Sequence, residues 1–177
     1  GSFAGGLAAV RLGDKKKGKW GFIDKQGRIV INPQFAESGG FSEGLAAIRL
    51  GEDKSRKWGF IDKQGKVVIK PQFDDYFPFS EELASVQVGD RKNGKWGFID
   101  KQGNMLIKPQ FDSEGVFVSG LAAIRIGDDA TGKWGFIDKQ GNMVIKPQFA
   151  QTGAFSEGLV DVRIGGKADG SWGYISR

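Results

Sequence analysis

The sequence Lys-Trp-Gly-Phe-Ile-Asp-Lys-Gln-Gly occupies residues 19–27 and recurs unchanged at residues 57–65, 95–103 and 133–141. A shortened form, Ser-Trp-Gly-Tyr-Ile, occupies residues 171–175. Successive tryptophans are 38 residues apart throughout, without insertion or deletion. A fixed period of this length is typical of repeat proteins, in which each unit needs its neighbours to complete a core. The expected units of this single array are residues 3–40, 41–78, 79–116 and 117–154, followed by a partial unit at 155–177.

Each unit is predicted to hold three short strands joined by two hairpins. In the second unit, residues 45–50 form the first strand, and residues 58–61 form the second after a loop of changing sequence. The turn Asp-Lys-Gln-Gly at 62–65 leads to a third strand at 66–69, which is rich in β-branched residues. Pro71 is expected to end the pairing of that strand, because proline has no N–H to donate. No segment shows the 3.6-residue period of an amphipathic helix, so the predicted unit is a three-stranded antiparallel meander.

The second strand carries the residues expected to build the core. Trp58 and Phe60 share one face of the strand, whereas Gly59 on the other face lets another backbone or a neighbouring ring approach closely. Each unit has more aromatic residues than one small sheet can bury, so stacked units should bury them as a continuous ladder. The predicted structural core positions are Trp20, Trp58, Trp96, Trp134, Trp172, Phe22, Phe60, Phe98 and Phe136.

Two all-β architectures suit such units: an open superhelical or solenoid array and a closed, five-bladed β-propeller. A ring usually completes its last blade with a strand from the other end of the chain. Here the last unit stops after its second strand, and the chain start at Phe3 supplies another first strand rather than the missing third one. The open array is therefore favoured, with the propeller as the alternative.

The composition excludes several kinds of site. The 177 residues contain no cysteine and no histidine, which excludes disulfides, thiolate or imidazole metal sites, and Cys-His or Ser-His catalysis. No metal and no cofactor are expected. A hairpin turn explains the one acidic residue that recurs in every full unit, and catalytic sites are singular, so we predict that the chain is not an enzyme. That recurring residue is Asp24, Asp62, Asp100 and Asp138.

The net charge and the first residues of the chain say less about function than the repeats do. The net charge is +5, and Lys15, Lys16, Lys17 and Lys19 supply most of the excess in one loop. Such a run can attract phosphate or anionic lipid, although a short charge run is more often a solvated hairpin tip. Gly1-Ser2 is typical of a cleaved expression tag, so we expect a piece of a longer protein whose compartment is unknown. No apolar run is long enough for a membrane span.

The combined pattern resembles the bacterial WG-repeat (KWG) family. It consists of Phe-Ser-Glu-Gly-Leu-Ala, Lys-Trp-Gly-Phe-Ile-Asp and Val-Ile-Lys-Pro-Gln-Phe, and it covers nearly the whole chain. Departures are small: Glu82 stands where other units have glycine, Val118-Ser119 replaces Ser-Glu, and Tyr174 replaces the second aromatic residue. The resemblance implies a β-repeat module of bacterial proteins that mediates binding, and it implies no catalytic residues.

Three binding functions follow as hypotheses. The leading one is a scaffold for protein–protein interaction, in which the variable loops meet the partner. Its candidate binding residues are Tyr76 and Phe77, for which filling a local packing gap is an equally good explanation, together with Lys15, Lys16 and Lys17. A carbohydrate- or cell-wall-binding module using exposed aromatic rings is the alternative. Nucleic-acid binding is the weakest, because the array beyond the first unit is nearly neutral.

Overall fold

The computed structural model describes residues 2–14, 17–50, 56–90, 93–166 and 169–176, so Lys15 and Lys16 lie outside the described residues. Every regular element within these ranges is a β-strand, which confirms the predicted all-β class. In chain order the strands are β1 (Leu7–Leu12), β2 (Lys19–Asp24), β3 (Ile29–Ser42), β4 (Leu45–Leu50), β5 (Trp58–Ile61), β6 (Val67–Phe73), β7 (Asp75–Tyr76), β8 (Ala84–Val88), β9 (Lys95–Ile99), β10 (Met105–Phe111), β11 (Phe117–Val118), β12 (Leu121–Ile126), β13 (Lys133–Asp138), β14 (Met143–Phe149), β15 (Gln151–Thr152), β16 (Leu159–Ile164) and β17 (Ser171–Ser176).

The strands form four antiparallel sheets. Each full unit contributes the predicted meander of first, second and third strand, as β4, β5 and β6 do in the second unit. The strand orders are β1-β2-β3-β4-β5-β6, β10-β9-β8-β7, β11-β12-β13-β14 and β15-β16-β17.

The third strand does not end at its proline, and the prediction for Pro71 is wrong on this point. Strand β6 continues to Phe73, which pairs with Trp58, while Ile69 pairs with Phe60. Two residues of β5 therefore face four residues of β6, so the strand carries a bulge around Pro71. A bulge is one of the places where a strand tolerates a residue without an N–H, because the ladder is already interrupted there.

The connectors between units are a second difference, since they were expected to be loops. Strand β3 runs on from the first unit and pairs with β4 of the second. In the same way β7 pairs with β8, and β15 pairs with β16. Strand β3 therefore joins the first two units in one six-stranded sheet, whereas β7 and β15 each add an edge strand to the sheet of the following unit.

Stacked sheets bury the predicted aromatic ladder. Each of the four hydrophobic clusters combines one face of a unit with the opposite face of the next, as when Phe60 and Ile69 meet Phe79 and Val86. Across each junction the phenylalanine of the Trp-Gly-Phe motif of one unit meets the first phenylalanine of the next unit edge to face, with ring centroids 4.8 to 5.3 Å apart. These pairs are Phe22–Phe41, Phe60–Phe79, Phe98–Phe117 and Phe136–Phe155.

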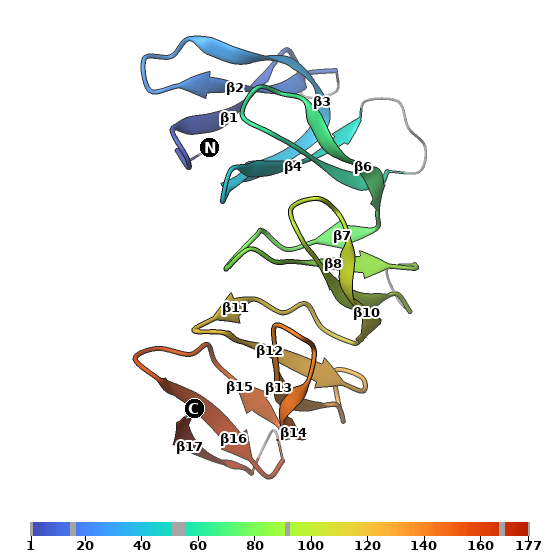
Figure 1. Ribbon diagram of the computed structural model, residues 1–177, viewed down its shortest axis with the longest axis vertical. Helices are drawn as coiled ribbons and strands as arrows, with labels where there is room; N and C mark the ends of the chain where they lie inside the picture. Colours follow the sequence, from blue (N-terminus) through green and yellow to red (C-terminus); the bar gives the residue numbers. More distant parts are fainter. Residues whose placement is uncertain (1, 15–16, 51–55, 91–92, 167–168, 177) are drawn as a thin grey trace.

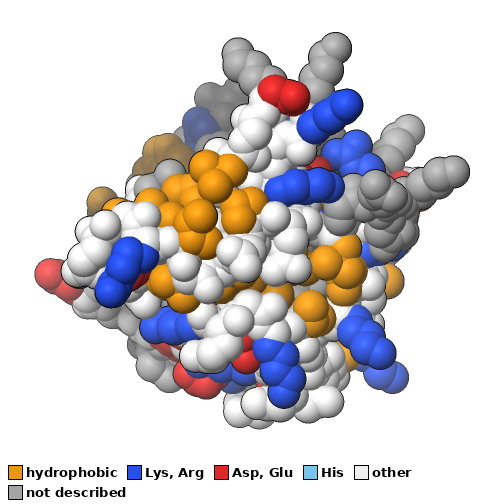
Figure 2. All heavy atoms as spheres, turned by 90° about the horizontal axis from the view of Figure 1, so that it is seen from above, with side chains coloured by type: hydrophobic (Ala, Val, Ile, Leu, Met, Phe, Trp, Pro, Cys, Tyr) orange, Lys and Arg blue, Asp and Glu red, His pale blue; other side chains and the backbone are white. Residues whose placement is uncertain are grey.

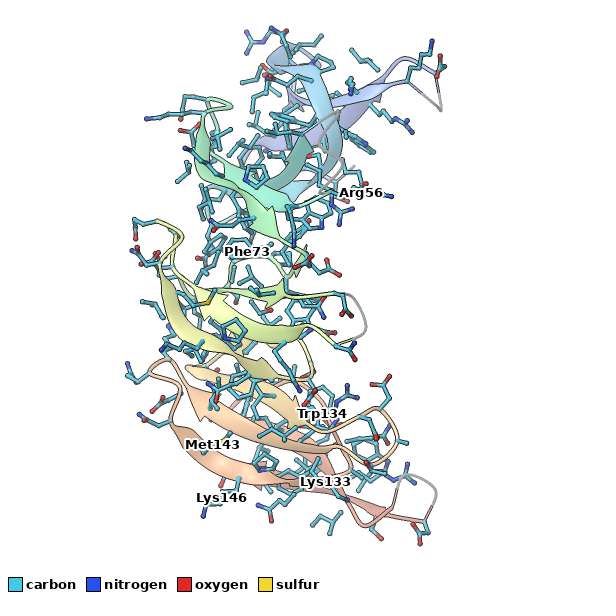
Figure 3. All side chains as sticks on the ribbon, turned by 90° about the vertical axis from the view of Figure 1, so that its right-hand side faces the viewer. Arg56, Phe73, Lys133, Trp134, Met143 and Lys146 are labelled. Atoms are coloured by element: carbon cyan, nitrogen blue, oxygen red, sulfur yellow. The ribbon has the colours of Figure 1, made fainter. Side chains whose placement is uncertain are left out.

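The array is open. Figure 1 shows the sheets one above another along the long axis, with the N-terminal sheet at one end and the C-terminal sheet at the other. The ends of the first strands and the starts of the second strands lie on one side of the stack, and the Asp-Lys-Gln-Gly turns lie on the opposite side (Figure 3). Seen from above, the N-terminal end shows hydrophobic side chains among basic ones (Figure 2). Val10 and Ile23 are partly exposed there, whereas their counterparts Ile48 and Ile61 are fully buried between the first and second units.

Candidate functional site

The recurring aspartates build turns. The Asp138 carboxylate accepts hydrogen bonds from the backbone N–H groups of Gln140 at 3.0 Å and Asn142 at 2.8 Å, and from the Asn142 side-chain amide at 2.9 Å. The side-chain amide of Asn142, assisted by the backbone donors, holds the pKa of Asp138 below its ordinary value. The Asp24, Asp62 and Asp100 carboxylates accept the equivalent backbone bonds. The repeated carboxylate is thus engaged within its own turn in every full unit.

The lysine of the same turn links neighbouring units. Lys101 in the third unit forms ion pairs with Glu43 of the second unit at 3.3 Å and with Glu82 at 2.8 Å. Lys139 pairs with Glu81 at 3.1 Å, and Glu81 also accepts the Gly120 N–H at 3.0 Å. The Phe-Ser-Glu-Gly turns and the Asp-Lys-Gln-Gly turns therefore join along one side of the array. The lysines and glutamates of these turns therefore hold neighbouring units together.

The five tryptophans differ in burial. Trp58 and Trp96 are buried, Trp20 and Trp134 are half-buried, and Trp172 is 55% exposed. The predicted core position is wrong for Trp172, because no further unit within these 177 residues covers the face that Trp172 shares with Tyr174. The predicted phenylalanines Phe22, Phe60, Phe98 and Phe136 are all buried.

Tyr76 and Phe77, the two predicted binding residues, have different environments. Tyr76 is half-buried between the second and third units, where its ring lies 4.6 Å from Trp58 and 5.7 Å from Phe60, measured between centroids. Burial, together with the charge of Asp75, raises the pKa of the Tyr76 hydroxyl. Phe77 is exposed at 40%. Tyr76 therefore serves packing, whereas Phe77 is accessible to a partner.

Phe77 lines a cavity of about 240 Å³ on the connector side of the array. The other walls come from the connectors at 114–116 and 152–154, and from β11, β12 and β13. Trp134, Phe136 and Phe155 supply the aromatic part of the lining. The cavity is mainly apolar and lies between the last two sheets.

A larger and more polar cleft of about 770 Å³ lies beside the hairpins of the third and fourth units. Lys95 forms an ion pair with Asp112 there, and Arg125 forms one with Asp129. Acidic side chains predominate in the lining, and the two cations are engaged with carboxylates. Of the three lysines predicted to bind a partner, only Lys17 lies among the described residues. It is exposed in the first unit and does not line this cleft.

A row of exposed aliphatic side chains was not predicted from the sequence. It occupies the first two positions of the third strand in successive units, along the side of the Asp-Lys-Gln-Gly turns, where Met143 is labelled in Figure 3. The signal was present, since three consecutive apolar residues in a strand cannot all point into one core. The members of this aliphatic row are Ile29, Val30, Val67, Val68, Leu106, Met143 and Val144.

The described residues contain neither a candidate metal site nor a membrane-spanning helix. No three acidic side chains lie close enough together to hold a metal ion in the part of the chain that the structure describes. In the same ranges, no helix is long and apolar enough to cross a membrane.

Comparison with known proteins agrees with the repeat organisation. The profile of a family described as "WG containing repeat" matches residues 20–52, 58–96, 96–128 and 134–167. No curated protein sequence matches the chain. Among solved structures, the fold is similar to that of BamB from Moraxella catarrhalis, with a TM-score of 0.52 and 11% sequence identity. That similarity covers 99% of this chain and 57% of the BamB chain, and at this identity it concerns the fold alone.

Proposed function

Because the chain belongs to the WG-repeat family, we propose that it is a non-enzymatic scaffold that binds another protein through the side-chain surface of its stacked sheets. The supporting observation is the aliphatic row. Exposed apolar patches mark interaction sites on soluble proteins, and the exposed aliphatic side chains recur at the same two strand positions in the four full units, except at Met105, which packs against a buried cluster. Stacked sheets lie about 10 Å apart, so the row offers anchor side chains at regular intervals along the array.

The strand edge beside the row does not favour pairing with an added strand. Third strands such as β6 and β10 lie at the edge of their sheets. A lysine followed by a proline, as in Lys70-Pro71 and Lys108-Pro109, stands within each of these two strands, and the ladder is bulged there. Charge, proline and bulges are the devices that block edge-to-edge pairing. The partner is therefore expected to bind through side chains.

The carbohydrate alternative has a narrower basis. Buried indoles such as those of Trp58 and Trp96 offer no stacking face to a sugar. Trp172 and Tyr174 are exposed on the last sheet and supply the strongest remaining platform. If the chain is a glycan-binding module, Trp172→Ala with Tyr174→Ala should abolish binding on a glycan array.

The scaffold is tested by adding charge to the aliphatic row. The variant Val68→Lys, Leu106→Lys, Val144→Lys places three ammonium groups in the row on exposed positions, so the fold should persist. Capture of proteins from an extract of the source organism, compared by quantitative mass spectrometry, should show that the partner retained by the wild-type array falls at least tenfold with this variant.

The matched control adds the same charge to the same three strands. Gln72→Lys, Gln110→Lys, Gln148→Lys alters exposed positions that lie outside the row. This control should capture the partner as the wild-type array does. Equal capture by all three proteins would contradict the proposal, and equal loss in both variants would show that net charge, rather than the row, governs binding.

A further inference from the structure

The apolar cavity between the last two sheets has a counterpart that is already occupied by a side chain of the protein. Its lining includes Gly115, Leu121, Ala123, Trp134, Phe136 and Phe155. Two repeat periods, or 76 residues, earlier in the sequence the same six positions are Gly39, Leu45, Ala47, Trp58, Phe60 and Phe79. The two sets stand at equivalent places in two different junctions between sheets.

In the earlier junction the Tyr76 ring packs among these residues. It contacts Trp58 and Phe60 at the centroid distances given above, and it packs against the cluster that contains Leu45, Ala47 and Phe79. Its hydroxyl comes so close to Gly39 that a Cβ on that glycine would lie 2.1 Å from the oxygen. This junction therefore shows which chemical group such a lining accepts: one phenol ring.

At the last junction the residue equivalent to Tyr76 is Thr152. Its hydroxyl lies 3.3 Å from the Gly153 carbonyl oxygen and 3.2 Å from that of Asp161, so the side chain is held against the backbone. A threonine has no ring to extend between the sheets. The space that Tyr76 fills in one junction is consequently left as the cavity of about 240 Å³ in the other.

The junction between the third and fourth units is closed in another way. Glu114 takes the place of Tyr76 there and is exposed. The backbone of Gly115 covers the Phe98 ring, since a Cβ on Gly115 would lie 2.9 Å from that ring. A junction that lacks the tyrosine therefore does not always contain a cavity. At the last junction the tyrosine ring is missing, and Trp134, Phe136 and Phe155 line the space that it would fill.

We infer that this cavity binds a tyrosine-like aromatic side chain of the protein partner, an inference that rests on the proposed function. Trp134, Phe136 and Phe155 offer ring edges and faces at the places where Trp58, Phe60 and Phe79 surround Tyr76. The cavity is smaller than the roughly 300–1,000 Å³ of pockets for drug-sized ligands, which suits a single ring. Exposed Phe77 adds a further ring to the wall.

The ring site can be tested without the partner. p-Cresol, which is the isolated tyrosine side chain, is titrated into the 177-residue protein, and the indole N–H signals of the five tryptophans are followed by NMR. One equivalent should bind and shift the Trp134 signal, and N-acetyltyrosine amide should compete for the same site. Absence of a saturable shift would overturn the inference. Binding of p-cresol without competition from the amide would rule out a side chain as the occupant.

Variants that exchange the two junctions sharpen the test. Thr152→Tyr supplies the missing ring and should weaken p-cresol binding at least tenfold, and Ala123→Met should do the same by filling the cavity from β12. Ser38→Tyr adds a tyrosine at the equivalent position of the first connector and should leave binding unchanged. Tyr76→Thr should open a second site, so that two equivalents bind. Unaltered binding in both filled variants would overturn the inference.

The result is separable from the test of the scaffold. If p-cresol does not bind but the lysine variants of the aliphatic row still lose the partner, only the inference about the ring site is overturned. If p-cresol binds but the lysine variants of the row capture the partner as well as the wild type does, the proposed role of the row is overturned.

Discussion

At the scale of single residues, the glycine after the tryptophan of each full unit has a specific structural role. It faces the bulged third strand of its own unit, so the backbone that was expected to approach this glycine comes from within the unit. A Cβ on Gly59 would lie 2.5 Å from the Ile69 carbonyl oxygen and 2.6 Å from the Pro71 nitrogen. The equivalent glycines Gly21, Gly97 and Gly135 meet the same obstruction.

Gly59→Ala is therefore expected to lower the free energy of unfolding by about 2 kcal/mol, since the bulge must move to admit a methyl group. Gly173→Ala is the matched control, because a Cβ on Gly173 would meet nothing within 4 Å. Chemical denaturation measures both. An equal effect at the two sites would mean that the glycine is needed for chain flexibility rather than for close approach.

At the scale of elements, the Asp-Lys-Gln-Gly turn depends on an ionised carboxylate. The pKa of Asp138 lies below its ordinary value of 3.8 in the folded protein. Because the folded-state pKa is lowered, the carboxylate stabilises the fold fully above the unfolded-state pKa, and this stabilisation is lost as the pH falls through the folded-state pKa.

Asp138→Asn should therefore lower Tm at pH 7, and the difference from the wild type should shrink as the pH falls below about 4. Thermal unfolding at pH 7, 5, 4 and 3 measures the effect. A difference that stays constant over this range would show that the turn needs only the oxygen acceptor, which asparagine retains, and not the charge.

At the scale of the whole molecule, each sheet contacts its immediate neighbours, so the array should tolerate the loss of one complete period. Deletion of residues 79–116 joins Pro78 to Phe117, which has the same position in its unit as Phe79. The shortened chain should fold and be shorter by about 10 Å, the spacing of stacked sheets, as measured by small-angle scattering.

A control deletion that removes only residues 79–107 breaks the period, and that chain should unfold or aggregate. If both deletions fold equally well, the sheets do not depend on the repeat register. If neither folds, contacts beyond nearest neighbours are essential to the array.

The sequence predicts what is periodic and misses what depends on contacts in space. The faces of Trp58 and Phe60 follow from strand geometry, and the stack follows from the number of aromatic residues. The bulge at Pro71 depends on room left by a glycine of the neighbouring strand. Strand β7 has two residues, too few to show a period, and it forms only because β8 offers an edge.

The candidate site was less predictable than the fold. Phe77 was recognised as distinctive, but the cavity beside it arises from what Thr152 lacks relative to Tyr76. That difference acquires meaning only when the two junctions are compared in space. The aliphatic row was overlooked because a β-branched third strand was taken as fully accounted for by strand propensity.

The connectors that join each sheet to the next have a consequence for synthesis on the ribosome. Translation releases the chain from its N-terminus, and the short connector strands β7 and β15 pair only with strands that emerge later, namely β8 and β16. The second and fourth units thus each leave a short strand that pairs only with the unit that follows. At these two boundaries the protein can grow in order, because the short strand nearest to the emerging chain belongs to the unit that has just been completed.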